Sequence, residues 1–316
     1  MSSHSSEPDR PLVEFKAANF TPQKNEGNWE NHPFYWFADG SIVLRIESTL
    51  YKIHRELLLK ISEGLSAILT IPTNKAAEDP DREGTEQVPL LVAGLTNLEF
   101  EDFLRTFVYR MSPLSNASDD EKERMFTNLL KISDLYIIAA GKDVAVENLD
   151  SIYLPPTRKL QLACEFRILK WIEPAVKSII SRPIHQLTTD EAERVGFSVY
   201  RILVQARDLV EKDIKRTAHL APPLAEDPSW ECADHKSCVK VWRRFWREEV
   251  GWKLLHPTTP MKLSEVWWTV KTFEHQGLTP RCLKDVADQI RDGSIFFEDR
   301  VVGGAAHAII ELYAIP

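Results

Sequence analysis

The chain has 316 residues, of which 43% are hydrophobic, and its formal net charge at pH 7 is −8. This composition is typical of a globular protein of about two domains, and the acidic excess argues against direct nucleic-acid binding, because phosphate contacts require clustered Lys and Arg. The sequence has no apolar run of the roughly 18 residues that cross a membrane, and its four cysteines are too few for a disulfide scaffold. We therefore expect a protein of the cytoplasm or nucleus.

The first strong pattern follows a polar arm. Residues 1–30 are rich in Ser, Pro, Glu, Asn and Lys, lack the apolar segment of a secretory signal, and predict a flexible N-terminal arm in which residues 12–15 could add a strand. Beyond the arm, Ile42, Leu44 and Ile46 recur at a spacing of two, which predicts a strand. Residues 50–53 predict a second strand that runs back beside the first.

After this hairpin the apolar residues follow helical spacing. The spacing predicts two short helices with a break at residues 62–64, formed around Leu57, Leu58, Ile61, Leu65, Ile68 and Leu69. Residues 72–87 predict an exposed loop, and Val88–Val92 a short strand at a sheet edge because it contains Pro89. Thr96 or Asn97 caps the next predicted helix, whose inner face comprises Leu98, Phe100, Phe103, Leu104, Phe107 and Val108.

Helices account for the rest of the chain. Ser118 and Glu121 have capping-box spacing and begin a helix that continues through Ile137. A later helix is expected to end near Ile172, and Pro174 is expected to bend it. Residues 190–213 predict one long helix. After a linker at 221–227, further helices are predicted at 239–250, 263–273, 283–290 and 305–313, with Gly303–Gly304 as a turn before the last one.

This order of elements resembles the BTB/POZ fold. Three stretches carry the resemblance: DGSIVLRIESTLYKIHRELLLKISEGLSAIL (39–69), VPLLVAGLTNLEFEDFLRTFVY (88–109) and FTNLLKISDLYIIAA (126–140). The resemblance implies an α+β fold, with a small sheet covered by helices over residues 31–148. Residues 149–216 are similar to the helical extension in the expanded BTB families of mushroom-forming fungi, and residues 217–316 form an all-α C-terminal region.

What the resemblance implies is an interaction scaffold or adaptor that homodimerises and recruits protein partners, rather than an enzyme. Its interaction residues would be Arg55, Leu57, Leu58, Ile61, Leu65 and Ile68. Two alternatives are a transcriptional regulator that recruits corepressors and a substrate adaptor for a cullin-type ubiquitin ligase. The chain departs from both patterns: Ser41 stands where the corepressor groove has an Asp, with Asp39 two residues earlier, and residues 114–116 lack the Glu of a cullin-binding triplet.

The strongest candidate for metal binding is Cys232, His235 and Cys238, in a Cys-x2-His-x2-Cys spacing, with Cys282 downstream. Thiolate and imidazole are the ligands that structural zinc prefers, and four of them complete a tetrahedron. Thr279 stands three residues before Cys282, where a second cysteine pair would need a thiol, so His235 would supply the missing ligand. The alternative is a set of reduced thiols beside a solvent-exposed histidine.

Other signals of chemistry are weaker. Asp79, Asp81 and Gly84 open like a calcium loop, but Leu90 stands where a bidentate Glu is required. The sequence has no nucleophile elbow, dinucleotide fingerprint, P-loop or HExxH motif, so we expect no enzyme activity, and we expect His54 and Cys164 to have structural roles. Tryptophans crowd the C-terminal third, where core packing explains most of them and an exposed one would mark a partner surface.

Overall fold

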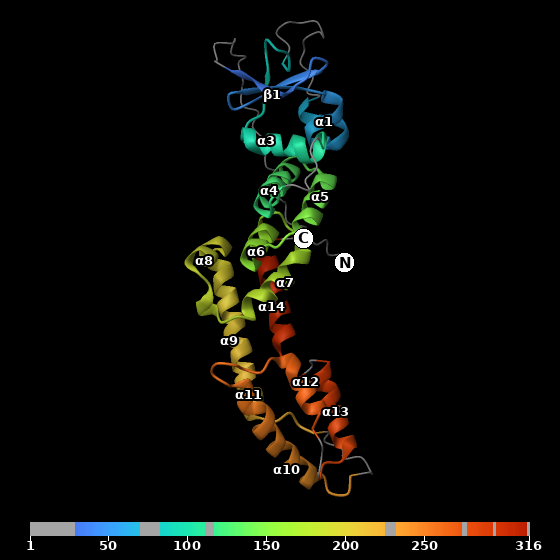
Figure 1. Cartoon of the computed structure of the whole chain (residues 1–316), viewed down its shortest axis with the longest axis vertical. Coiled ribbons are helices and arrows are strands. Elements are labelled where there is room, and N and C mark those ends of the chain that lie inside the picture. Colours follow the sequence, from blue (N-terminus) through green and yellow to red (C-terminus); the bar gives the residue numbers. More distant parts are fainter. Residues whose placement is uncertain are drawn as a thin grey trace, which may run out of the picture. The chain divides into compact units, whose positions relative to one another are not determined.

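The chain divides into two units, an N-terminal unit up to Ile152 and a C-terminal unit from Tyr153 (Figure 1). The structure is a computed structural model that describes residues 29–69, 83–110, 117–224, 232–273, 277–292 and 295–314. The protein is a mixed α+β protein, with a small four-stranded sheet in the N-terminal unit and helices throughout the described C-terminal unit. The predicted segments 149–216 and 217–316 both contribute to the C-terminal unit.

The sheet has the strand order β1-β3-β2-β4. Its centre is the predicted hairpin, in which β2 (Ile42–Ile46) pairs antiparallel with β3 (Thr49–Ile53), and this prediction is confirmed. At one edge β4 (Leu90–Leu91) pairs in parallel with β2, so the predicted edge strand is present but shorter. At the other edge β1 (Glu30–Trp36) pairs in parallel with β3, a strand that the sequence pattern did not predict.

The helix pair after the hairpin consists of α1 (Arg55–Ile61) and α2 (Glu63–Leu69), as predicted. A close approach to a neighbouring backbone explains the break between them. Ser62 Oγ donates a hydrogen bond of 2.5 Å to the Tyr136 carbonyl oxygen, and a Cβ atom added at Gly64 would lie 2.6 Å from the same oxygen. Only glycine fits at this contact.

The other helices of the N-terminal unit are α3 (Asn97–Phe103), which continues as a π-turn over Leu104–Val108, α4 (Asp119–Leu135) and α5 (Ala139–Asp150). The predicted caps are confirmed, because the side chains of Thr96 and Ser118 each accept a hydrogen bond from the backbone of a Glu three residues later. The predictions for α3 and α4 were wrong in two details. Leu98 points to solvent instead of the core, and α4 ends at Leu135, so Ile137 lies beyond it in an exposed position.

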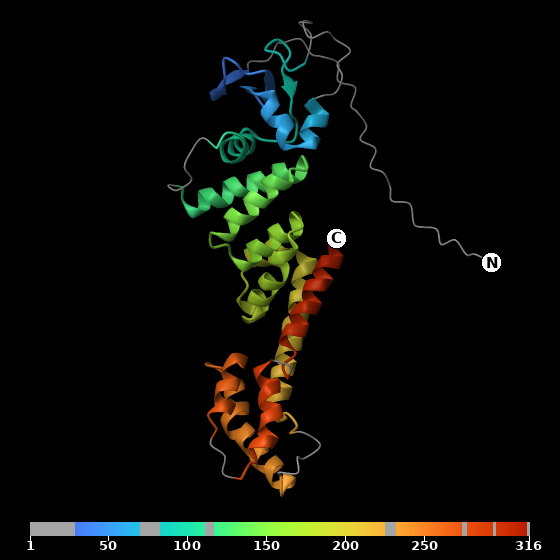
Figure 2. The same ribbon diagram turned by 90° about the vertical axis from the view of Figure 1, so that its right-hand side faces the viewer.

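The C-terminal unit is helical in its described part. Its first elements are α6 (Pro156–Glu165), α7 (Leu169–Ile180), a 3₁₀ turn (Ile184–Gln186), α8 (Thr189–Val195) and α9 (Phe197–His219). They are followed by α10 (His235–Phe245), a π-turn (Trp246–Gly251), α11 (Trp252–Leu254), α12 (Leu263–Lys271), α13 (Pro280–Arg291) and α14 (Glu298–Leu312). Figure 2 shows α14 alongside α9, and α14 also packs on α7. No helix in the described ranges combines the length and apolarity needed to cross a membrane.

Three predictions for this unit were wrong. Residues 190–213 do not form one helix, because Gly196 adopts φ +80° and separates α8 from α9, a conformation that glycine reaches at little cost. The helix expected to end near Ile172 continues through Pro174 to Ile180. Gly303 and Gly304 form no turn, because they lie inside α14.

A cluster of aromatic residues joins the end of α9 to the helices that follow. Trp246 Nε1 donates a hydrogen bond of 2.7 Å to the Thr217 carbonyl oxygen, and Trp242 Nε1 donates one of 2.8 Å to the Pro222 carbonyl oxygen. Both indoles are buried, as core packing predicts. Trp252 and Trp268, by contrast, are more than half exposed, at 53% and 60%.

One buried carboxylate connects α3 to α4 in the N-terminal unit. The side chain of Asp102 is 4% exposed and accepts hydrogen bonds from Arg124 and, at 2.7 Å, from Asn128 Nδ2. Burial raises the pKa of Asp102 in spite of these partners. The carboxylate therefore depends on Arg124 and Asn128 for the hydrogen bonds that water would otherwise supply.

We expect Arg124→Met to lower the free energy of unfolding by about 3 kcal/mol, because it leaves the Asp102 carboxylate buried without its cationic partner. Lys122→Met is the matched control on the same helix and should cost less than about 1 kcal/mol, since Lys122 pairs at 3.7 Å with Asp119, whose side chain is 66% exposed and keeps its contact with water. Urea denaturation followed by circular dichroism measures both values. Equal effects of the two variants would contradict the importance of this buried pair.

Candidate metal centre

The first half of the site is built at the start of α10. The Asp234 side chain caps this helix by accepting a hydrogen bond of 3.2 Å from the Ser237 amide. The cap makes His235 the first helical residue and places Cys238 one turn later on the same face, because residues three apart on a helix are neighbours. Cys232 lies in the chain just before the cap. Local structure thus brings all three side chains to one end of α10.

The second half of the site is the start of α13. Pro280 is the first residue of α13, and Cys282 lies within its first turn. The preceding residue, Thr279, donates its backbone N–H to Cys238 Sγ at 3.4 Å, while its hydroxyl oxygen lies 3.5 Å from the same sulfur. The N-termini of α10 and α13 therefore meet, and the partial positive charge of both helix ends favours thiolates there.

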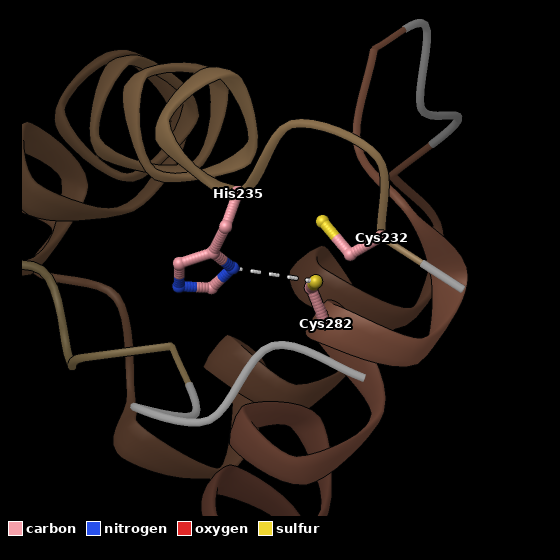
Figure 3. A group of neighbouring side chains, drawn as sticks. All are labelled: Cys232, His235 and Cys282. Atoms are coloured by element: carbon pink, nitrogen blue, oxygen red, sulfur yellow. Dashed lines mark hydrogen bonds between the residues drawn. The ribbon is translucent and has the colours of Figure 1, made fainter. Parts of the chain in front are cut away.

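Figure 3 shows Cys232, His235 and Cys282 with their side chains directed toward one another. One ligand atom from each lies within 4.8 Å of the other two. Cys282 Sγ is 3.6 Å from His235 Nδ1, and Cys232 Sγ is 3.6 Å from Cys238 Sγ. Cys238 does not belong to the group of three, but joins it from the side of Cys232.

These distances match the edges of a zinc tetrahedron. With Zn–S of about 2.3 Å and Zn–N of about 2.0 Å, two sulfurs on one ion are about 3.8 Å apart, and a sulfur and a nitrogen about 3.5 Å. The two measured separations of 3.6 Å lie close to these values. Cys232, His235 and Cys282 are thus grouped closely enough to serve as ligands of one metal ion, whereas Cys238 would have to move closer to complete a tetrahedron. An N–H such as that of Thr279 is a typical outer hydrogen bond to a ligand sulfur.

The thiols differ in acidity. Burial opposes ionisation of Cys238, but the hydrogen bonds from Thr279 and Cys232 outweigh it and lower the pKa of Cys238 below its usual value. Burial, together with the neighbouring Cys232 and Cys238, raises the pKa of Cys282 to about 12. Ionisation of Cys238 is therefore favoured over that of Cys282, and a bound cation would stabilise every thiolate around it.

The alternative of reduced thiols beside an exposed histidine agrees less well with the structure. All four cysteines of the chain are free, as both alternatives require, so burial is what distinguishes them. Cys238 and Cys282 are almost fully buried, and His235 is half-buried instead of exposed to solvent. A chance grouping in a surface loop would not direct three buried or half-buried ligand atoms toward a common point.

The predicted interaction residues lie on α1 and α2. Leu58 and Leu65 are buried in the core of the N-terminal unit, whereas Leu57 and Ile61 are half-buried and remain accessible. The guanidinium of Arg55 donates to the Leu69 carbonyl oxygen and so spans the helix pair. The side chain of Ile68 lies outside the described residues.

The position that the family resemblance assigns to a groove Asp has a local role in this chain. Ser41 Oγ accepts a hydrogen bond of 3.0 Å from the Arg55 amide and donates one of 2.8 Å to Glu56. Asp39 instead pairs with His54 Nε2 at 3.3 Å, and this contact holds the pKa of Asp39 below its usual value. The triplet at 114–116 and the acidic residues Asp79 and Asp81 lie outside the described residues.

Comparison with known proteins gives no relative: no protein-family model, curated protein or solved structure matches the chain. The candidate ligands were nevertheless found from their spacing. Sequence reasoning missed the role of Thr279. This residue stands where a further cysteine ligand was considered, and in the structure its backbone N–H donates a hydrogen bond to Cys238. Its position before Pro280, at the start of a helix, was the available signal, because a residue there often caps the helix.

We expect Cys164 to resist alkylation in the folded protein. It is buried on α6, and burial raises its pKa to about 11, so very little of it is thiolate at pH 8. After metal removal by a chelator, iodoacetamide should modify the half-buried Cys232 and leave Cys164 unmodified until the protein is denatured. Mass spectrometry of the alkylated peptides reads out both sites, and fast labelling of native Cys164 would contradict its structural role.

Proposed function

We propose that the protein is a non-enzymatic interaction scaffold whose N-terminal unit is a BTB/POZ domain and whose C-terminal helical unit is held together by structural zinc. The observation that carries the first part is the order of elements: the β2–β3 hairpin, the α1–α2 pair, and β4 returning to β2 before α3 and α4. This is the order of the family that the sequence resembles.

The accessible apolar residues of the N-terminal unit support a binding role. Leu57 and Ile61 are half-buried on α1, although Leu58 between them is fully buried. At the end of α4, Leu135 and Ile137 are exposed at 53% and 79%. Accessible apolar side chains on packed helices are typical of association surfaces, and a second copy of the chain is the simplest partner for them.

The proposal extends to partner recruitment by the dimer. Recruitment of a corepressor and delivery of substrates to a cullin-type ligase would both use the same dimeric scaffold. Ser41 hydrogen-bonds to the start of α1 and leaves the groove without its Asp, which counts against the corepressor alternative. The sequence of residues 114–116 lacks the Glu of a cullin-binding triplet, which counts against the other alternative. Affinity purification from the native cell, with identification of the bound proteins, distinguishes these partners.

We expect the chain to be a dimer in solution, with twice the 36.3 kDa mass of one chain in multi-angle light scattering at micromolar concentration. Leu57→Asp/Ile61→Asp should give the monomer mass, because two charges on this helix face must be desolvated in the dimer. Lys60→Asp, at an exposed position of the same helix, should leave the dimer intact. A wild-type monomer across the same concentration range would refute the dimeric scaffold.

The zinc ion would be held by Cys232, His235, Cys238 and Cys282. Its role would be structural, because all four ligand positions come from protein side chains and none remains for a substrate. Cys238 and Cys282 belong to the same buried cluster as Trp242, Val266 and Val286, so the ion would close one end of a hydrophobic core. Zinc would thereby fasten α10 to α13.

We expect about one equivalent of zinc per chain in protein purified without chelator, measured by inductively coupled plasma mass spectrometry. Cys238→Ser should remove most of the metal and lower the melting temperature by several degrees, since a lost ligand opens the end of the core. Cys164→Ser is the control, because Cys164 lies on α6 and should leave the zinc content unchanged. Absence of metal from the wild-type protein would rule out the zinc site and leave the scaffold proposal standing.

A further inference from the structure

The C-terminal unit contains a cleft that lies apart from the metal centre. Its volume is about 690 Å³, within the range of about 300–1,000 Å³ that is usual for small-molecule sites. Residues of α7, α9, α11, α12, α13 and α14 line it, together with the chain between α11 and α12 and Phe296 before α14. None of the four candidate zinc ligands belongs to its walls.

The floor of the cleft is apolar. Val210, Leu254, Ile290 and Phe296 form its buried part, and Ile214, Met261 and Leu263 are half-buried around them. These side chains come from four helices and two connecting segments, so the floor is a concavity between packed elements. An alkyl chain or ring placed there would be removed from water, which contributes about 0.8 kcal/mol for each buried methylene group.

The rim of the cleft is charged, and most of its charges already have partners. Lys177 pairs with Asp299 at 2.8 Å. Arg207 pairs with Glu211 at 3.0 Å and donates to the Ile180 carbonyl oxygen at 2.7 Å. These contacts hold the rim in place without need of a ligand.

Two further cations on the rim are available. Lys215 and Lys262 both line the cleft and are exposed, and within the described part of the chain neither has an ion-pairing carboxylate within 4.0 Å. The lining as a whole contains five Lys and Arg residues and only three Asp and Glu residues, in a chain whose net charge is −8. The cleft is thus locally cationic on an acidic protein.

We propose that this cleft binds a small amphipathic carboxylate, with the apolar chain on the floor and the carboxylate against Lys215 and Lys262. A neutral apolar ligand would leave both ammonium groups unused. A ligand with several negative charges would meet Glu211, Glu298 and Asp299 on the same rim, and like charges at short range oppose binding. One negative charge on an apolar body satisfies both conditions.

Isothermal titration calorimetry on the full-length protein tests the proposal with three probes that share one alkyl chain. Dodecanoate should bind with one site per chain. Dodecylammonium, with the opposite charge, and dodecyl phosphate, with up to two negative charges, should each bind at least about tenfold more weakly. Equal binding of dodecanoate and dodecylammonium, tighter binding of dodecyl phosphate, or no binding of dodecanoate would each overturn the proposal.

Two variants locate the binding site. Lys215→Glu/Lys262→Glu should weaken dodecanoate binding about tenfold or more without unfolding the protein, since both residues are exposed. Met261→Asp should weaken it through the floor, which provides a second test if the double variant is unstable. Lys240→Glu on α10 lies outside the cleft and is the charge-matched control, with unchanged affinity expected. An unchanged affinity in both cleft variants would place any binding elsewhere and overturn the assignment.

An acidic protein segment is the competing occupant. A peptide that alternates Leu and Glu residues presents the same chemistry on a larger scaffold. If this peptide binds and is not displaced by dodecanoate, or if it binds where dodecanoate does not, the cleft is a peptide site and the small-molecule proposal is wrong. Failure of the carboxylate test would leave the dimer and zinc measurements unaffected, because neither uses a residue of the cleft.

Discussion

The packing of the C-terminal unit depends on how the backbone carbonyl groups in the last turn of α9 find hydrogen-bond donors. The final carbonyl groups of any helix lack partners within the helix and need donors from elsewhere. Trp246 supplies one through its indole N–H to Thr217, and the chain then passes so close to the helix end that a Cβ atom at Gly251 would lie 2.3 Å from the Ala218 carbonyl oxygen. This close contact decides where α10, α11 and all that follows can pack.

Both candidate sites of the C-terminal unit follow from that contact. The π-turn at Trp246–Gly251 joins α10 to α11, so the N-terminus of α10 faces the start of α13 while α11 and the segment after it approach α9. The contact of α10 with α13 brings the thiols together, and the approach of α11 and the following segment to α9 forms the cleft. The buried cluster that contains both indoles also contains Cys238 and Cys282 of the metal centre and Leu254, Ile290 and Phe296 of the cleft floor, so the two sites share one core.

Local signals allowed much of the fold to be predicted. The capping boxes at Thr96 and Ser118 involve residues only three apart, and the candidate metal ligands of α10 follow from spacing within one helical turn. Features that depend on distant residues were missed. β1 was not recognised, since its buried residues, His32 and Tyr35, are three apart and its register along β3 is irregular. The helix break at Gly196 was not predicted because the apolar stripe of residues 190–213 continues across it. The cleft was not predicted because its lining residues are spread over positions 177–299 and form no local sequence pattern.

The spacing of the four candidate ligands along the chain has a consequence for assembly. Cys232, His235 and Cys238 precede α12, while Cys282 follows it, so a metal ion bound by all four encloses that whole helix in a loop. The first three ligands leave the ribosome together and would form a partial site before the last one is synthesised. Arrival of Cys282 would then close the loop against an ion that is already in place, and the chain-entropy cost of that closure grows only slowly with the loop's length. A metal ion bound by all four residues would in this way join the two ends of the segment that contains α12.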